Sequence, residues 1–193
     1  MEQLTEVKIR EDNKVKGWNR KKLYVLRTKS HPIYRKLRMR MYHNGRRTVD
    51  EYCMKILTPL GLLIWYLDDG SITYDKRGKS RGMDIRIHSN AYTEAENKMM
   101  MKYLNDRFGL RFNLYQNFKK KRMKRYFGLR LKAVDRLKFY DEIIAPNMEY
   151  IPPDMKYKIP NRETIVALIE NPQNRKGSME ELREKYSLNS MET

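Results

Sequence analysis

One apolar stretch with an acidic end constrains this sequence more than any other feature. Residues 58–70 read Thr-Pro-Leu-Gly-Leu-Leu-Ile-Trp-Tyr-Leu-Asp-Asp-Gly. Thr58 before Pro59 is typical of a helix N-cap followed by the first helical position, and Gly70 is a suitable end. The predicted helix over 58–69 is apolar on nearly every side. A helix of this kind is buried, so we expect protein to cover it from several directions.

The acidic end of this helix lies where the backbone dipole disfavours it. Asp68 and Asp69 fall at the C-terminus, which carries a partial negative charge, so each carboxylate is disfavoured by about 0.3–1 kcal/mol. We expect a cation to compensate. A divalent ion such as Mg²⁺ fits, because it prefers oxygen ligands. The alternative is a solvated pair of carboxylates beside Lys and Arg side chains.

The charge of the chain points to a polyanionic partner. The 193 residues include 42 Lys and Arg against 24 Asp and Glu, a formal net charge of +18. Hydrophobic residues make up 40%, which excludes a wholly disordered basic tail. Nucleic acid is the partner that this charge favours, and a basic protein without such a partner is the alternative.

Cysteine content and hydropathy narrow the class of protein further. Cys53 is the single cysteine, so the chain forms no intramolecular disulfide and no Cys-based zinc site. No apolar run approaches the ~20 residues that span a bilayer, and the first residues lack the apolar core of a signal peptide. We therefore expect a cytoplasmic, intracellular protein without a membrane partner.

The hydrophobic periodicity predicts an α+β fold. Apolar and polar residues alternate over 83–87, 112–115 and 126–132, which is typical of half-buried strands. Thr93 and Glu96 form a capping box before a helix that ends at Gly109. From residue 58 the expected order is helix, two strands, helix, two strands, helix, with one sheet whose apolar face is covered by helices. Further expected elements are a strand over 22–28 and helices over 32–42, 134–144 and 178–188.

The polar faces of the strands are candidate nucleic-acid contacts. A two-stranded ribbon fits the major groove, where Arg can read guanine and Asn can read adenine. The basic turn over 119–125 is suited to phosphates, which add affinity but little sequence specificity. An ordinary solvated sheet face is the alternative. The candidate residues are Arg81, Arg86, His88, Asn113, Tyr115, Asn117, Lys119, Lys121, Arg122, Lys124, Arg130 and Lys132.

The stretch from Leu60 to Gly70 resembles the signature helix of the LAGLIDADG homing endonucleases. The resemblance covers about residues 20–165 and implies an αββαββα repeat with a curved antiparallel sheet. It also implies metal-dependent, site-specific hydrolysis of double-stranded DNA. Asp69 would be the catalytic, metal-binding acid, with Gly70 beside it at the Mg²⁺ site. Lys158 matches a lysine of the catalytic centre, and Arg47, after Arg46, stands where the first repeat has its catalytic lysine.

Only one such helix is present, so the sequence holds about one and a half repeats. We expect residues 1–57 to be the end of a preceding, partial repeat, residues 58–165 to form the endonuclease-like domain and residues 166–193 to form a helical tail. A homodimer or a partner chain would supply the second acidic helix. The resemblance also implies a role in intron mobility. The alternative is a protein that binds DNA or intron RNA without cleavage: a maturase, a regulator or a degenerate nuclease half.

Overall fold

The computed structural model describes residues 8–12, 23–27, 30–74, 82–119 and 124–170. By its contacts the chain divides into two compact units, residues 1–46 and residues 47–193. Each unit is a separate body here. The helix expected over 178–188 lies outside the described residues, as do Arg81 and the central part of the basic turn. The domain boundaries expected at residues 57 and 165 stay predictions.

The N-terminal unit contains a β-hairpin and one helix. Strand β1 (Lys8–Asp12) pairs antiparallel with β2 (Leu23–Arg27), which confirms the strand expected over 22–28. Helix α1 (Pro32–Met41) follows, and the ring of its N-cap, His31, accepts a hydrogen bond from the backbone N–H of Ile33. None of the residues of α1 is buried. The apolar side chains of α1 are therefore not buried by any other described residues.

Two very short strands lie at the junction of the units. Strand β3 (Tyr42–His43) pairs with β4 (Arg46–Arg47). The turn between them has Asn44 at φ 50° and Gly45 at φ 72°. Both values lie in the left-handed region that Asn and Gly tolerate best, so these two residues suit a tight reversal.

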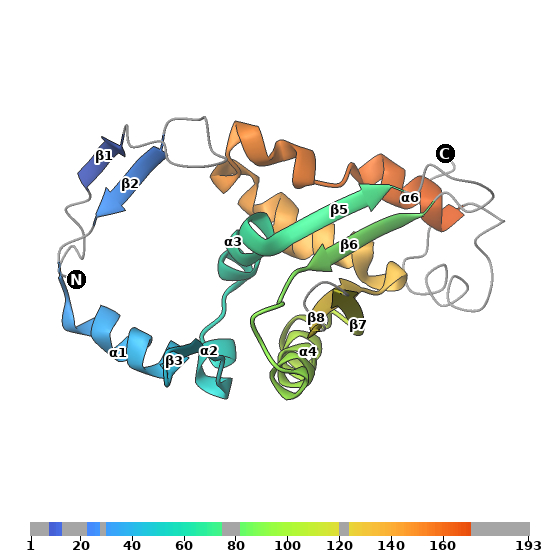
Figure 1. Cartoon of the computed structure of the whole chain (residues 1–193). Coiled ribbons are helices and arrows are strands. Elements are labelled where there is room, and N and C mark those ends of the chain that lie inside the picture. The colour runs from blue at the N-terminus through green and yellow to red at the C-terminus, as the bar shows by residue number, and fades with distance from the viewer. Residues whose placement is uncertain (1–7, 13–22, 28–29, 75–81, 120–123, 171–193) are drawn as a thin grey trace. The chain divides into compact units, whose positions relative to one another are not determined.

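The C-terminal unit contains a four-stranded antiparallel sheet in the order β5-β6-β8-β7. Helix α3 runs directly into β5, and β6 lies beside it (Figure 1). From residue 58 the order is the expected one, so the predicted α+β fold is confirmed. The helices and strands are α2 (Glu51–Lys55), α3 (Pro59–Asp69), β5 (Gly70–Tyr74), β6 (Met83–Ile87), α4 (Glu94–Phe108), β7 (Phe112–Lys119), β8 (Lys124–Leu131), α5 (Arg136–Phe139) and α6 (Arg162–Glu170). Short turns of 3₁₀ or π helix complete the unit: η2 (Ala133–Asp135), η3 (Tyr140–Ile144), η4 (Ala145–Tyr150) and η5 (Pro153–Lys158).

One face of the sheet is covered by helices and the other is polar. On β6, Met83, Ile85 and Ile87 are buried, whereas the residues between them are only half-buried. Helix α4 packs on β7 and β8, and α3 packs on β5, β6 and η3. The alternation along β6 therefore separates an apolar core from a polar face, as a sheet with one covered side requires.

Helix α3 is buried on one side only. Thr58 is its N-cap and accepts a hydrogen bond from the N–H of Gly61, as the sequence predicts. Leu62, Leu63, Tyr66 and Leu67 are buried, but the side chain of Ile64 is 57% exposed. The expected cover from several directions is present at η3, β5 and β6, but within the described residues it does not extend to Ile64.

The helix expected over 134–144 is broken into shorter pieces. Residues 133–135 form the 3₁₀ turn η2, α5 is four residues long, and residues 140–144 form the π-helical η3. Asp135 stands at the change from 3₁₀ to α-helix. Its carboxylate accepts hydrogen bonds from the backbone and the guanidinium of Arg111, which fixes the turn. The bounds of α6 were not predicted, although its last residues overlap the helical tail expected over 166–193.

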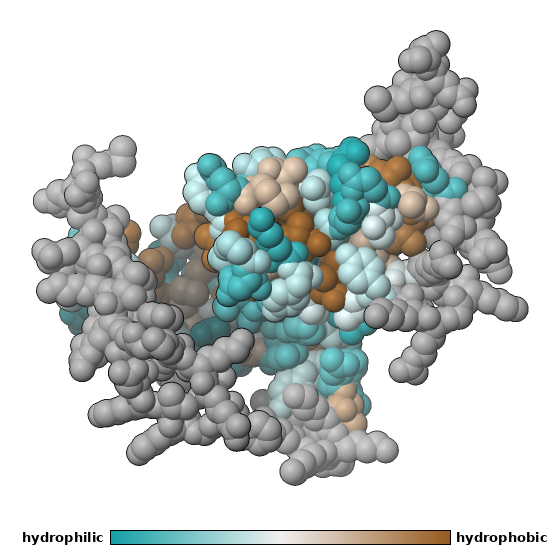
Figure 2. All heavy atoms as spheres, turned by 90° about the horizontal axis from the view of Figure 1, so that it is seen from above, coloured by the Kyte–Doolittle hydropathy of each residue, from teal (hydrophilic) through white to brown (hydrophobic). Residues whose placement is uncertain are grey.

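The surface mixes apolar and polar groups. Seen from above, hydrophobic side chains lie among hydrophilic ones without segregating to one end (Figure 2). Exposed large apolar residues of the C-terminal unit include Met148, Tyr150 and Tyr157. No helix within the described ranges combines the length and the apolarity that a membrane span needs.

Candidate functional site

The C-terminal end of α3 is in contact with a positively charged side chain from a residue about 90 positions away in the sequence. The ammonium of Lys158, at the end of η5, donates hydrogen bonds to the carbonyl oxygens of Leu67 (2.6 Å) and Asp68 (3.2 Å). No basic residue lies in the last turn of α3 itself. Lys158 therefore supplies a cation at the acidic helix end, against the backbone carbonyls of Leu67 and Asp68.

A second contact fixes the same corner. The hydroxyl of Tyr66, whose side chain is fully buried, donates a 2.6 Å hydrogen bond to the backbone carbonyl of Lys158. Gly70 follows α3 with φ −89°, so its backbone is not strained. A Cβ at Gly70 would lie 2.2 Å from the carbonyl oxygen of Tyr66 and 2.3 Å from its ring. Close approach, rather than an unusual φ, requires glycine here.

Asp69 is the last residue of α3 and directly precedes strand β5 of the sheet. Its side chain is half-buried, whereas Asp68 is exposed. The backbone carbonyl of Asp69 accepts a 2.8 Å hydrogen bond from the N–H of His88, at the end of β6. Helix end and strand end are thus joined, and Asp69 lies where α3 meets the sheet.

His88 connects the helix end to the opposite edge of the sheet. Its Nε2 lies 2.8 Å from the Ser71 hydroxyl oxygen and its Nδ1 lies 2.8 Å from the hydroxyl oxygen of Tyr115. Burial lowers the pKa of His88, and the charges of Arg86 and Lys158 lower it further, against the opposing effect of Asp69. The imidazole is therefore neutral at pH 7 and suited to hydrogen bonding rather than to charge.

Arg47 reaches the same region through Tyr92. The guanidinium of Arg47 is hydrogen-bonded to the side chain of Tyr92. Burial raises the pKa of Tyr92, the positive charge of Arg47 lowers it, and the negative charge of Asp69 raises it. Arg47 and Asp69, both predicted from the sequence as catalytic, therefore both act on Tyr92.

The polar face beside this corner is built around one carboxylate. Arg86 on β6 lies opposite Arg130 on β8, a pairing of like charges that would destabilise the sheet. Asp84 accepts hydrogen bonds from both guanidinium groups, from Arg86 Nε at 2.7 Å and from Arg130 Nε at 2.8 Å. Its side chain is mostly buried. The three residues thus form a fixed triad in the middle of the face.

Tyr115 crosses this face because its partner in the sheet has no side chain. Tyr115 lies opposite Gly128 in the β7–β8 pairing. A Cβ at Gly128 would lie 2.4 Å from the tyrosine ring and hydroxyl. The guanidinium of Arg86 lies 5.1 Å from the ring centroid, a cation–π contact. The ring is therefore held flat between strands, with its hydroxyl on His88.

The predicted site residues fall into three groups. Lys158 reaches the end of α3 beside Asp69, and Arg47 is connected with this region through Tyr92. Arg86, His88, Asn113, Tyr115, Asn117, Arg130 and Lys132 lie on the strands of the sheet or directly after them, with the alternation expected for one polar face. The side chains of the other predicted residues lie outside the described part of the structure: Arg81, Lys119, Lys121, Arg122 and Lys124.

Several residues of the site were not expected from the sequence. Tyr92 is one, and its only sequence signal is its place directly before the capping box at Thr93. Ser71 follows Gly70 and resembles an ordinary strand residue. Asp84 belongs to the alternating strand, but nothing in the sequence indicates that it pairs with Arg130, 46 positions away. These partners depend on the strand order.

The donor set of this chain fits half of a divalent-cation site. No group of three or more His, Cys, Asp and Glu side chains that could hold an ion occurs within the part of the chain that the structure describes. Asp69 offers one half-buried carboxylate, the ligand type that Mg²⁺ and Ca²⁺ prefer.

Comparison with known proteins agrees with this geometry. A stretch of RecA from Mycolicibacterium flavescens is 32% identical over 121 residues, which is 60% of this chain and 27% of that protein. A probable intron-encoded DNA endonuclease of Mycosarcoma maydis is 29% identical over 106 residues, 55% of this chain and 66% of that one. The chain thus spans about a quarter of the RecA relative.

The fold has a counterpart among solved structures. The homing endonuclease I-WcaI, in complex with its DNA recognition sequence, superposes with a TM-score of 0.55. The match covers 79% of this chain and 62% of that one, at 22% sequence identity. A family model described as the LAGLIDADG DNA endonuclease family matches residues 2–137, well over half of the sequence. The chain therefore belongs to the LAGLIDADG DNA endonuclease family.

Proposed function

We propose that this protein is a site-specific DNA endonuclease of the homing type that hydrolyses phosphodiester bonds of double-stranded DNA. The observation that carries the proposal is the ammonium of Lys158 at the end of α3, bonded to the carbonyls of Leu67 and Asp68 next to Asp69. An acidic residue and an ammonium beside a basic, polar sheet face are the groups that cleavage of a phosphodiester needs. Family membership and the DNA-bound structural relative support the same activity.

Each residue of the corner has a distinct proposed role. Lys158, held by the carbonyls of α3, stabilises the negative charge that develops on the phosphate. Arg47 neutralises a neighbouring phosphate and is oriented by Tyr92. Asp69, with the backbone of Gly70, would hold a divalent cation, which when bound supplies Lewis-acid polarisation of the phosphodiester. We propose Mg²⁺ for this role.

The polar face supplies the binding surface. Arg86 and Arg130, fixed by Asp84, present guanidinium groups to the major groove, and Asn113 and Asn117 on β7 present amides. Since both kinds of group read base edges, the face provides sequence specificity. Lys132, directly after β8, contacts the backbone. His88 and Tyr115 lie nearest to the cutting position and fix the polar surface there.

A homodimer would complete the site. The described residues contain one acidic helix end, and Ile64 on the same helix exposes its side chain. Packing α3 against α3 of a second copy would cover Ile64 and bring the second Asp69 alongside the first. Each copy would then cut one strand of the duplex.

The direct test is plasmid nicking with purified protein in Mg²⁺. Asp69→Asn removes the charge without changing the size of the side chain and should reduce cutting by about 100-fold or more. Asp68→Asn is the matched control, because Asp68 is the adjacent but exposed acid, and it should cut nearly as well as the natural chain. Undiminished cutting by Asp69→Asn would contradict the proposed function.

A non-cleaving binder of DNA or intron RNA is the second candidate. The single acidic helix end among the described residues favours it, since one carboxylate is half of a cutting centre. Such a protein would bind nucleic acid equally in Mg²⁺ and in EDTA and would yield no product with any divalent metal. Binding that strengthens with Mg²⁺, together with cleavage, would exclude this candidate.

A further inference from the structure

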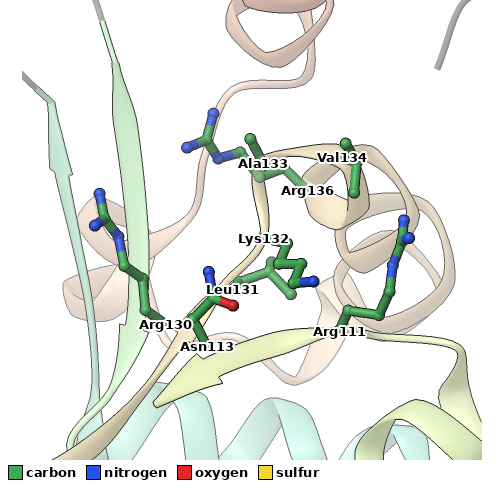
Figure 3. A pocket seen from close by; sticks show the side chains of 8 residues that line it. All are labelled: Arg111, Asn113, Arg130, Leu131, Lys132, Ala133, Val134 and Arg136. Carbon is green, nitrogen blue, oxygen red and sulfur yellow. The ribbon is translucent and has the colours of Figure 1, made fainter. Parts of the chain in front are cut away.

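A pocket lies at one end of the polar face, next to η2. Its volume is about 360 Å³, within the range of small-ligand sites. It is lined by the start of β7, the end of β8 and the turn into α5. Arg130 and Arg136 lie on one side, Arg111 lies on the other, and Asn113 and Lys132 lie between them (Figure 3).

The lining is strongly cationic, and two of its guanidinium groups are fixed. Arg111 donates to Asp135 through Nε (2.9 Å) and Nη2 (3.0 Å), and Asp135 is buried. Arg130 donates through Nε to Asp84. These pairs hold two walls of the pocket in place. With Lys132 and Arg136, four of the eight lining residues are positively charged.

Arg136 is the least satisfied of these cations. Its side chain is half-buried, and its Nε, which is shielded from solvent, has no hydrogen-bond partner within the described residues. Burial lowers the pKa of Arg136, Asp84 opposes this effect and Arg130 adds to it. Leaving a buried donor unpaired costs about 1–3 kcal/mol, so an unpaired donor of this kind calls for an explanation.

We propose that this pocket binds a phosphate group, with Arg136 as the principal ligand. Because its Nε is shielded, Arg136 would bind through the terminal Nη groups, whose N–H donors suit phosphate oxygens, and Lys132 adds a second charge at the rim. The identity of the phosphate rests on the proposed function. It is a backbone phosphodiester of the bound duplex, because Arg130 and Asn113 belong both to the pocket and to the proposed DNA-binding face. Free inorganic phosphate is the other source of the same chemistry.

The first experiment measures DNA affinity as a function of KCl concentration. Two duplexes of unrelated sequence are used, because a backbone contact affects every sequence equally. Arg136→Gln should weaken binding to both duplexes about tenfold and reduce the slope of log K against log salt by about 0.9, the value for one lost phosphate contact. Lys98→Gln, an exposed cation on α4, is the matched control and should leave the slope unchanged.

The second experiment uses the unsubstituted chain, so it does not depend on the folding of a variant. Inorganic phosphate is titrated while the Arg136 Nε–H signal is followed by NMR, the signal being identified by its absence in Arg136→Lys. A saturable shift at millimolar phosphate supports the pocket. A saturable shift with an unchanged salt slope assigns the pocket to free phosphate and overturns the DNA source.

The remaining outcomes are also decisive. An unchanged slope together with no saturable shift overturns the proposal. If the unsubstituted chain fails to bind either duplex, the proposed function fails, and the phosphate titration alone decides whether the pocket is a phosphate site.

Discussion

Lys158 lies at the point where α3 most needs a positive charge. Its ammonium is bonded to two carbonyls of the helix end, and its own backbone carbonyl accepts the Tyr66 hydroxyl. Two neighbouring carboxylates at a helix C-terminus are disfavoured by the partial negative charge there. One well-placed ammonium offsets part of that electrostatic cost. The residue proposed to stabilise charge on the phosphate therefore also stabilises the helix that carries Asp69.

Replacement of Lys158 should affect both properties. Lys158→Met removes the ammonium and leaves the carbonyls of Leu67 and Asp68 without it, so we expect the free energy of unfolding to fall by about 1–2 kcal/mol. Urea denaturation measures this change, and plasmid nicking should be lost as well. Lys156→Met, an exposed lysine of the same turn, should change neither. Equal stability of the two variants would show that the helix end does not depend on Lys158.

At the level of elements, the start of β7 and the turn η2 are joined through Asp135. This carboxylate is 1% exposed and accepts hydrogen bonds from the backbone N–H and the guanidinium of Arg111. The pairing sets where β8 ends and α5 begins. It also forms one wall of the pocket beside the polar face.

The buried pair should matter more than a similar pair on the surface. Asp135→Asn removes the charge that compensates Arg111, and we expect a loss of about 2–3 kcal/mol in unfolding free energy, since Arg111 keeps part of its solvation. Asp141→Asn breaks the exposed pair with Arg162 and should cost about 0–1 kcal/mol. Thermal and urea unfolding of both variants test the difference. Equal losses would contradict the structural role given to burial.

At the level of the whole molecule, the exposed side of α3 bears on the proposed homodimer. A helix this apolar, with Ile64 57% exposed, leaves hydrophobic surface uncovered in a single chain. Covering that side chain with a second copy would be favourable, because burial of apolar area drives association. The same packing would place two Asp69 carboxylates at one position.

Disruption of this face should prevent both pairing and double-strand cutting. Ile64→Lys introduces a charge on the exposed side of α3, so we expect the variant to remain monomeric with DNA and to lose double-strand cleavage. Tyr150→Lys is a matched control, since Tyr150 is 56% exposed and belongs to η4 rather than to α3. Light scattering with and without duplex DNA reports the mass. A dimeric, fully active Ile64→Lys protein would exclude this interface.

Local rules predicted the elements whose signals lie within a few residues of each other. The Thr58 cap, the capping box of Thr93 and Glu96 and the alternation of β6 are all present as expected. The break in the helix over 134–144 was missed because it depends on Arg111, 24 positions from Asp135. Ile64 was expected to be buried because composition alone cannot tell which side of an apolar helix its neighbours cover.

The sequence by itself determined that an apolar helix ends in two aspartates and that basic strands follow it, since hydrophobic periodicity, capping and charge are local properties of the chain. Only the tertiary structure decided that Lys158 and His88 meet that helix end and that Asp84 joins two strands. It also decided that Arg136 lines a basic pocket. These contacts join residues far apart in the chain, and their positions follow from strand order and packing rather than from any local preference.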